Sequence, residues 1–215
     1  MYQIKEMYYT LQGEGARAGR PSVFCRFTGC NLWSGREKDR SEAVCNFCDT
    51  DFVGVDGPGG GKFADSLELS AAIALLWPNE EPNKYIVFTG GEPGLQLDDE
   101  LIDQLHSKNF EVAVETNGTL HLPTNIDWLT VSPKADSTLK IKAGNELKLV
   151  YPQENVSPQS YEDLNFENFY LQPMDNADKD KNTQRTIQYC LENPKWKLSL
   201  QTHKYMGIAK KKDFI

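Results

Sequence analysis

Short apolar runs bounded by turn residues alternate along the chain with stretches in which apolar residues recur at helical spacing. Runs rich in β-branched and aromatic residues are typical of strands, and the longer periodic stretches are typical of helices. The runs predict strands at Ser22–Thr28, Tyr85–Thr89, Glu111–Glu115, Trp128–Ser132, Glu146–Val150, Phe169–Leu171 and Trp196–Leu200. The periodic stretches predict helices at Ser66–Trp77, Asp98–Lys108 and Thr183–Glu192.

Two local patterns refine these elements. Ser66 precedes Leu69, Ile73 and Leu76, which places a capping hydroxyl ahead of an apolar helix face. The glycine-rich segment Gly54–Gly61 predicts a turn at the tip of an excursion from the core.

Strands that alternate with helices favour a parallel sheet, either open or rolled into a barrel. The predicted helices are too few for eight complete strand–helix units. We therefore expect an α/β fold, a partial (β/α) barrel of about six parallel strands with few helices. Residues 1–215 are interpreted as one domain, because no linker, repeat or low-complexity segment divides them.

Polar residues and glycines follow the apolar runs at six places, in FTGC, TGGEP, ETNG, SPK, QPMD and QTHKY. Glycine, asparagine and proline are ordinary turn residues, so one such segment means little. In barrels and open α/β sheets, however, ligands bind at the carboxyl ends of the strands. The recurrence therefore predicts one binding site along one edge of the sheet.

Charge and hydropathy limit the classes of molecule with which the protein is expected to interact. The formal net charge is -8, which opposes contacts with phosphates, and the basic run KKKD near the end is interpreted as a solvated tail. A small molecule is therefore expected rather than nucleic acid. The longest apolar run, Leu69–Trp77, is too short to cross a bilayer, and no signal peptide is visible, so we expect a cytoplasmic protein without membrane contact.

Three of the five cysteines, Cys30, Cys45 and Cys48, have the spacing C-x14-C-x2-C. Clustered cysteines in a reducing compartment bind metal or perform chemistry more often than they form disulfides. Cys25 and Cys190 lie in apolar or helical stretches and are predicted to be packing residues.

The missing fourth thiol separates two kinds of site. A structural zinc site needs four ligands, and His106, His121 and Asp49 could supply the fourth, but none has the spacing of a zinc finger. A cubane iron–sulfur cluster held by three cysteines instead leaves one iron open for a substrate or cofactor.

The cysteine pattern resembles the radical S-adenosylmethionine superfamily, whose usual signature is C-x3-C-x-aromatic-C. Cys45, Phe47 and Cys48 match its second half, and an extended cluster loop at 31–44 replaces the short first gap. TGGEP, at 89–93, is similar to the superfamily motif that meets the amino group of adenosylmethionine. LQGEG, CDT, SPK, ETNGT, QPMD and LSLQTHKY together closely resemble the 7-carboxy-7-deazaguanine synthase family.

The resemblance implies a radical carbon–nitrogen lyase of queuosine and 7-deazapurine biosynthesis. Its reaction contracts the ring of 6-carboxy-5,6,7,8-tetrahydropterin to 7-carboxy-7-deazaguanine and releases ammonia. It also implies a [4Fe-4S] cluster, S-adenosylmethionine and Mg²⁺ as cofactors, an electron donor such as flavodoxin, and a homodimer. The cofactors carry the radical chemistry, so no side chain is assigned a catalytic role.

The same resemblance assigns residues to each ligand. Iron ligation falls to Cys30, Cys45 and Cys48, and magnesium ligation to Thr50. Adenosylmethionine is expected against Phe47, Asp49, Gly91, Glu92, Asn117, Ser132, Pro133, Lys134, Gln172, Pro173, Met174 and Asp175. The pterin is expected against Leu11, Gln12, Gly13, Glu14, Arg26, Thr89 and His203.

Simpler interpretations stay open for several of these residues. Glu14 could be a solvated loop acid, His203 a structural histidine and Thr50 a turn cap, whereas Arg26 on an apolar strand requires a buried partner or a ligand.

Two other functions also remain open, a glycyl-radical-enzyme activase that acts on a protein partner and a zinc-stabilised binding module. The ending AKKKDFI departs from relatives whose C-terminus lies near the pterin.

Overall fold

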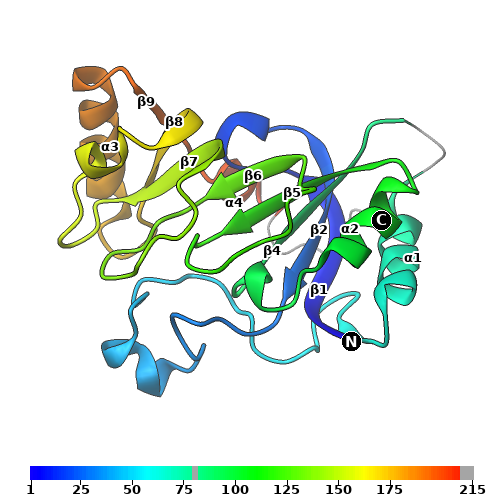
Figure 1. Ribbon diagram of the computed structural model, residues 1–215. Helices are drawn as coiled ribbons and strands as arrows, with labels where there is room; N and C mark the ends of the chain where they lie inside the picture. Colours follow the sequence, from blue (N-terminus) through cyan, green and yellow to red (C-terminus); the bar gives the residue numbers. More distant parts are fainter. Residues whose placement is uncertain (79–81, 209–215) are drawn as a thin grey trace.

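The computed structural model describes residues 1–78 and 82–208 (Figure 1). Its strands are β1 Tyr2–Leu11, β2 Pro21–Phe27, β3 Gly61–Phe63, β4 Lys84–Gly90, β5 Phe110–Thr116, β6 Trp128–Val131, β7 Ala143–Tyr151, β8 Asn165–Pro173 and β9 Trp196–Leu198. Its α-helices are α1 Ser66–Leu76, α2 Asp99–His106, α3 Lys179–Glu192 and α4 Thr202–Met206. Short 3₁₀ helices cover Gly15–Arg17, Glu37–Glu42, Pro93–Leu95 and Pro158–Tyr161.

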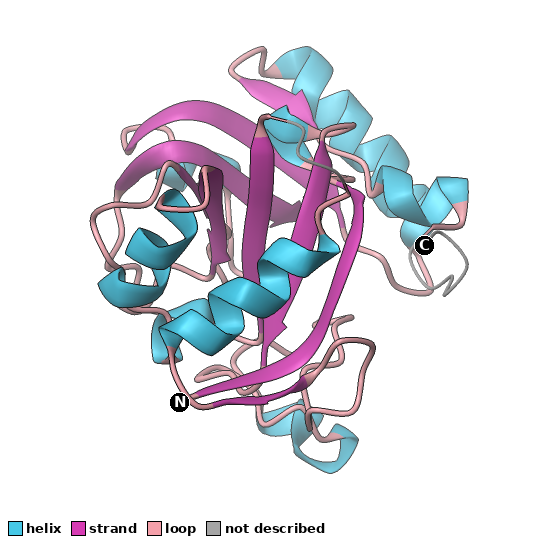
Figure 2. Ribbon diagram, turned by 90° about the vertical axis from the view of Figure 1, so that its right-hand side faces the viewer, coloured by secondary structure: helices cyan, strands magenta, loops and turns pink. Residues whose placement is uncertain are grey.

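A nine-stranded sheet in the order β3-β1-β2-β4-β5-β6-β7-β8-β9 runs through the described part of the chain. From β2 to β9 all neighbouring strands are parallel, whereas β1 pairs antiparallel with both β2 and β3. The order leaves β3 and β9 as two edges, so the curved sheet stays open (Figures 1 and 2). The predicted α/β class, a mostly parallel partial barrel with few helices, is confirmed.

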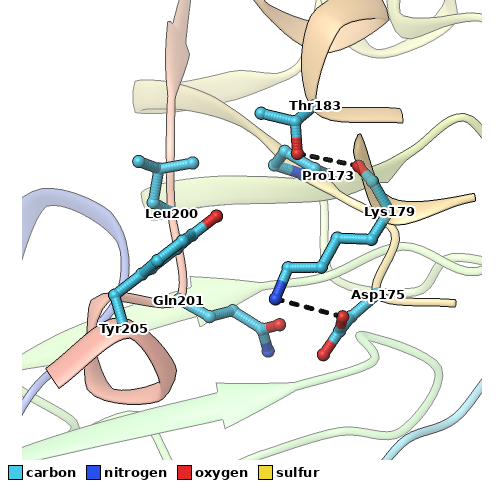
Figure 3. Close-up of a pocket in the computed structure, with 7 residues that line it drawn as sticks. All are labelled: Pro173, Asp175, Lys179, Thr183, Leu200, Gln201 and Tyr205. Atoms are coloured by element: carbon cyan, nitrogen blue, oxygen red, sulfur yellow. Dashed lines mark hydrogen bonds and ion pairs between the residues drawn. The ribbon is translucent and has the colours of Figure 1, made fainter. Parts of the chain in front are cut away.

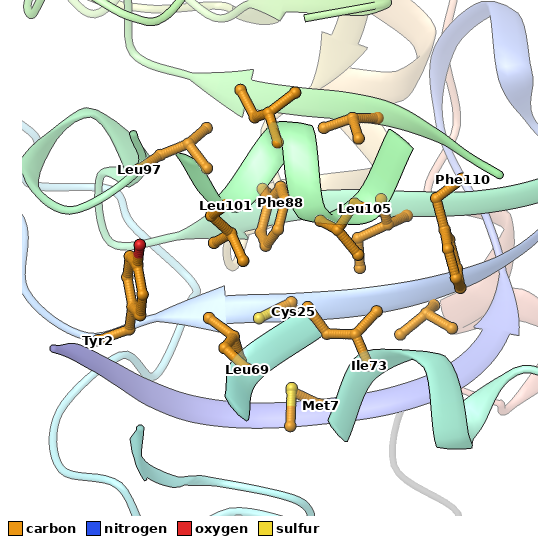
Figure 4. Close-up of a cluster of buried hydrophobic side chains, with 14 of the residues drawn as sticks. Tyr2, Met7, Cys25, Leu69, Ile73, Phe88, Leu97, Leu101, Leu105 and Phe110 are labelled. Carbon is orange, nitrogen blue, oxygen red and sulfur yellow. The ribbon is translucent and has the colours of Figure 1, made fainter. Parts of the chain in front are cut away.

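Helices α1 and α2 cover one face of the sheet across β1, β2, β4 and β5 (Figure 4). Leu69 and Ile73 of α1 and Leu101 of α2 are fully buried in this cluster, because their spacing of three to four residues puts them on one side of each helix. Cys25 lies in the same cluster with no exposed surface, as its apolar surroundings predict.

A second cluster lies under α3, at the other end of the sheet (Figure 1). It joins β6, β7, β8 and β9 through side chains such as Leu147, Leu171 and Trp196. Cys190 of α3 packs against it, which confirms its predicted packing role. Leu129 of β6 touches both clusters and so connects the two halves of the hydrophobic interior.

Strands β1 and β3 were not predicted from the sequence. For β1, the physical reason is an irregularity in its pairing with β2. The pairing of β1 with β2 shifts between Ile4 and Glu6, so the consecutive residues Ile4 and Lys5 are both buried. This irregularity breaks the alternation by which a half-buried strand is recognised.

The predicted turn in Gly54–Gly61 is present, but the segment does not form the tip of an excursion from the core. Gly57 N donates to Lys5 O over 2.9 Å, and Met7 N donates to Pro58 O over 2.7 Å. The segment therefore packs along β1. A Cβ on Gly60 would stand 2.3 Å from the same Lys5 carbonyl oxygen, which explains the need for glycine here.

The cap of α1 also differs from the expectation. Asp65, one residue before Ser66, caps the helix by accepting a 2.9 Å hydrogen bond from Glu68 N. The Ser66 hydroxyl is buried and donates to Glu100 over 2.7 Å, so it joins α1 to α2 instead.

None of the helices within residues 1–78 and 82–208 has the length and apolar character needed to cross a membrane. The basic tail AKKKDFI, with the run KKKD, lies outside the described residues.

Candidate functional site

The residues expected around adenosylmethionine lie at one edge of the sheet. Gly91 and Glu92 follow β4, Asn117 follows β5, and residues 132–134 follow β6. Residues 172–175 include the last two residues of β8 and the two that follow. Since these strands are parallel, their carboxyl ends share one edge, which is where ligands bind in such folds.

The backbone after β4 contacts the segment that leads to Cys30. Glu92 N donates to Gly29 O over 2.8 Å, and Gly91 N donates to Phe27 O over 3.3 Å. A Cβ on Gly91 would stand only 1.8 Å from the Gly29 carbonyl oxygen. Only glycine permits this approach, and the approach ties TGGEP to the start of the cluster loop.

Glu92 is fully buried, and both of its carboxylate oxygens are bonded within the protein. Oε1 accepts from Thr116 Oγ1 over 2.7 Å and from Gly94 N over 2.9 Å, while Oε2 accepts from Asn117 N over 2.8 Å. Burial raises the pKa of Glu92, and these hydrogen bonds oppose the rise. The carboxylate thus holds the end of β4 to the end of β5.

The three motif cysteines come together at this edge. Cys45 is buried, and Cys30 and Cys48 are half-buried. A hydrogen bond from the Cys45 thiol lowers the pKa of Cys48 to about 6, and burial together with the charge of Cys48 raises the pKa of Cys30. The thiols therefore lie close enough to influence one another electrostatically.

This arrangement fits a cluster better than a single ion. Within the described ranges, no three His, Cys, Asp or Glu side chains converge on one metal ion. The thiolates of a cubane bind different irons, so they need not converge on one point. The donor set, with three thiols and no histidine, is also the one that iron–sulfur clusters use.

The extended loop at 31–44 leaves the sheet and returns. It contains the 3₁₀ helix Glu37–Glu42, and Cys45 N donates to Leu32 O over 3.4 Å at the point of return (Figure 1). Asn31 also accepts a 3.0 Å hydrogen bond from the side chain of Asn117, the residue after β5. The loop is therefore attached to the sheet edge next to Cys30.

Lys134 brings a partly buried amine to the cysteines. Its Nζ donates to Ser132 Oγ over 2.7 Å and to Ser132 O over 2.6 Å. Burial lowers the pKa of Lys134, whereas the charges of Cys45, Cys48 and Glu92 raise it. A cation among thiolates reduces the repulsion between their negative charges.

Lys204 of α4 joins two of the expected adenosylmethionine segments. Its Nζ forms ion pairs with Asp49, at 2.6 Å, and with Asp175. Asp175 also lines a small pocket between the end of β8, α3 and α4, where Lys179 approaches it to 3.4 Å (Figure 3). The other lining residues are Pro173, Thr183, Leu200, Gln201 and Tyr205.

The face of the sheet away from α1 and α2 carries a row of polar residues. Arg26 of β2 pairs with Thr89 of β4, and Glu115 of β5 pairs with Thr130 of β6, which pairs with Glu146 of β7. Phe88 and Val114, which directly precede Thr89 and Glu115, pair with each other and point to the helices. Successive residues of a strand face opposite sides, so the polar row faces the barrel interior.

The LQGEG segment enters this interior from the end of β1. Glu14 accepts hydrogen bonds from Lys148 over 2.5 Å and from Gln201 over 3.0 Å. Burial alone would raise the pKa of Glu14, but the charge and hydrogen bond of Lys148 lower it to about 2. Glu14 is therefore a largely buried, ionised carboxylate with its side chain 13% exposed, and its interpretation as a solvated loop acid is wrong.

The other residues expected to contact the pterin have the following contacts. Gln12 Nε2 donates to Glu115 over 3.0 Å, and Gly13 is so close to His203 that a Cβ would stand 2.2 Å from Nδ1. Leu11 ends β1 opposite Pro21. The guanidinium of Arg26 is paired by its Nε with Glu6 over 2.9 Å, so the charge on this apolar strand has a half-buried partner within the protein.

Lys148, Glu115 and Glu146 were not among the site residues expected from the sequence. The Lys148 side chain is 5% exposed and lies 3.3 Å from Glu115, and the charge of Glu146 also acts on it. The sequence carries a signal for them, because NELKLVY places Glu146 and Lys148 at alternate positions of an otherwise apolar strand. A charge repeated at that period in a buried strand indicates an interior polar site.

Comparison with known proteins extends these observations. No family model matches the chain. A 7-carboxy-7-deazaguanine synthase of Caulobacter vibrioides is 57% identical over 207 residues, which cover 96% of this chain and 99% of the relative. One of Nitratidesulfovibrio vulgaris is 56% identical over 213 residues with the same coverage.

The fold also has a counterpart of known structure. The crystal structure of QueE from Escherichia coli matches with a TM-score of 0.66 at 26% identity and covers 93% of each chain. The near-complete coverage by relatives sharing more than half of their residues, together with this fold and the cysteine site, leads to one assignment. The chain belongs to the 7-carboxy-7-deazaguanine synthase family of radical S-adenosylmethionine enzymes.

Proposed function

We propose that this protein contracts the ring of 6-carboxy-5,6,7,8-tetrahydropterin to give 7-carboxy-7-deazaguanine and ammonia, in queuosine and 7-deazapurine biosynthesis. The observation that carries the proposal is the identity of 56–58% with synthases of that name along nearly the whole chain. The three thiols at the carboxyl edge of a partial barrel support it. The activase and the zinc module receive no support from these relatives.

The chain's own residues divide the work between two regions. Cys30, Cys45 and Cys48 would hold three irons of a [4Fe-4S] cluster, and the strand ends after β4, β5, β6 and β8 would hold adenosylmethionine. When bound, this cofactor pair supplies a carbon radical that takes hydrogen from the substrate. The protein binds and orients the reacting groups and keeps water away from them.

The pterin would bind in the interior, between the polar row and LQGEG. Arg26, Thr89 and Glu14 lie on or against this face, and His203 packs on Gly13. The substrate's pyrimidine edge presents an amino group and a ring N–H, which a carboxylate accepts. Lys148 and Gln201 each donate to one oxygen of Glu14. The remaining lone pairs of these two oxygens would therefore accept the hydrogen bonds of the pterin.

Three further parts complete the proposal. Thr50 would bind Mg²⁺ through its hydroxyl, which lies 3.5 Å from a carboxylate oxygen of Asp49. Electrons would come from a donor such as flavodoxin, and two copies of the chain would form a homodimer. The magnesium assignment fails if the rate of Thr50→Ala depends on added magnesium in the same way as the wild-type rate.

The function is tested with anaerobically reconstituted protein, adenosylmethionine, reductant and the carboxypterin. We expect 7-carboxy-7-deazaguanine as the product, detected by chromatography and mass spectrometry. Cys45→Ala should lose iron and turnover, whereas Cys25→Ala, matched in residue type but placed in the core, should keep both. Wild-type protein that carries a full cluster and yields no deazaguanine would exclude the proposed reaction.

A further inference from the structure

The loop between the first two motif cysteines places an arginine on the backbone of the other two. Arg40 Nη1 donates to the carbonyl oxygens of Asn46, at 2.9 Å, and Cys48, at 3.0 Å. In the part of the chain that the structure describes, no other side chain donates to a backbone carbonyl of residues 45–48. One guanidinium thus spans the C-x2-C turn.

Arg40 is itself held from two other directions. Its Nε and Nη2 donate to the two carboxylate oxygens of Glu37, at 2.7 and 2.6 Å. Its guanidinium stacks over Trp33, 4.1 Å from the ring centre, and Trp33 packs edge-on against buried Phe52. A planar fork with five donors can make all these contacts at once, which an ammonium cannot.

The turn needs such an anchor because its own backbone offers little. Residues 44–47 form bends and turns, and Cys48 also lies outside any helix or strand. Two thiolates on this turn must nevertheless keep fixed positions relative to Cys30. The charge of Arg40 also acts on Cys45 and Cys48, and a cation at that place opposes the repulsion among thiolates.

We propose that Arg40 is a positioning residue, which the extended loop supplies to hold the C-x2-C turn in the conformation that binds the cluster. The inference rests on the proposed cluster ligation by Cys30, Cys45 and Cys48. It gives the long first cysteine gap a physical purpose. The loop carries the arginine, its carboxylate partner Glu37 and the Trp33 platform as one unit.

The test compares Arg40→Gln, Arg40→Lys and Arg36→Gln. Arg36 is the matched control, because it lies exposed in the same loop. After anaerobic reconstitution we measure iron and sulfide content and the rate at which an iron(II) chelator removes iron. Both Arg40 variants should release iron about tenfold faster or more, the effect expected from losing a charge-assisted hydrogen bond. Arg36→Gln should match the wild type.

Two further measurements separate positioning from general stability. Thermal unfolding of the metal-free proteins should be the same, since the loop lies outside the sheet, while the electron paramagnetic resonance spectrum of the reduced cluster should change in Arg40→Gln. If the Arg40 variants do not fold, Glu37→Gln provides the test, because it removes the carboxylate that orients the guanidinium.

Iron release from Arg40→Gln at the rate of Arg36→Gln, with an unchanged spectrum, would overturn the inference. Failure of the cluster assignment itself would look different. It would appear as a Cys45→Ala protein that binds as much iron and sulfide as the wild type.

Discussion

At the scale of single residues, we expect the ion pair of Glu14 and Lys148 to have the largest effect on the free energy of unfolding. Lys148→Met leaves Glu14, Glu115 and Glu146 without their shared cation, so the free energy of unfolding at neutral pH should fall by about 3–5 kcal/mol. Chemical denaturation measures this loss. Lys62→Met, an exposed lysine on β3, should change stability by less than about 0.5 kcal/mol.

The pH dependence of stability should change sign with this substitution. In the wild type the pKa of Glu14 is lowered to about 2, so its stabilisation is present above the unfolded pKa and is lost as the pH falls toward 2. Without Lys148, burial raises that pKa above its unfolded value. The variant should therefore gain stability as the pH falls from 7 to 5. A variant that shows the wild-type slope would contradict the account of Glu14 as a buried ionised acid.

At the scale of elements, the contact between TGGEP and the segment before Cys30 is tested by Gly91→Ala. The added methyl group meets the Gly29 carbonyl, so backbone must move, at a cost of about 1–3 kcal/mol. Because that backbone leads directly to Cys30, cluster content should fall as well. Iron and sulfide assays and thermal unfolding measure the two effects.

Gly61→Ala is the control for this substitution. Its methyl group would lie 3.6 Å from the Phe63 ring, an ordinary contact, so stability should change by no more than about 0.5 kcal/mol. Equal iron content and equal stability in Gly91→Ala and Gly61→Ala would show that the close approach at Gly91 is unimportant.

At the scale of the whole molecule, we propose that residues 1–215 fold as one cooperative unit. The sheet is continuous, and Leu129 joins the cluster under α1 and α2 to the cluster under α3. Leu101→Ala and Trp196→Ala, one in each cluster, should lower stability by about 2–5 and 3–5 kcal/mol. Each should shift a single unfolding transition seen by both far- and near-ultraviolet circular dichroism. Two separate transitions, each moved by only one substitution, would mean two independent units.

The sequence by itself determined the parallel strands, the three long helices and the order of the site segments. Apolar runs identify buried strands because most strands here are covered on at least one face, and turn residues mark the strand ends. The cysteine spacing and TGGEP predict where a cluster would bind, since that chemistry requires thiolates and a close backbone approach. Strand β1 was not predicted, because its irregular pairing breaks the alternation of buried and exposed residues.

Only the tertiary structure decided what each polar side chain meets. A sequence shows that Glu92 and Glu14 are charged, but their partners come from distant segments, 24 residues away for Glu92 and Thr116 and 187 residues away for Glu14 and Gln201. The partners of Arg40 lie within eight residues of it, yet only the return of the loop brings them together. Strand register and loop return place these partners, and neither is encoded locally. That is why Glu92 turned out to join two strand ends, Glu14 to be paired with a buried lysine, and Arg40 to span the cysteine turn.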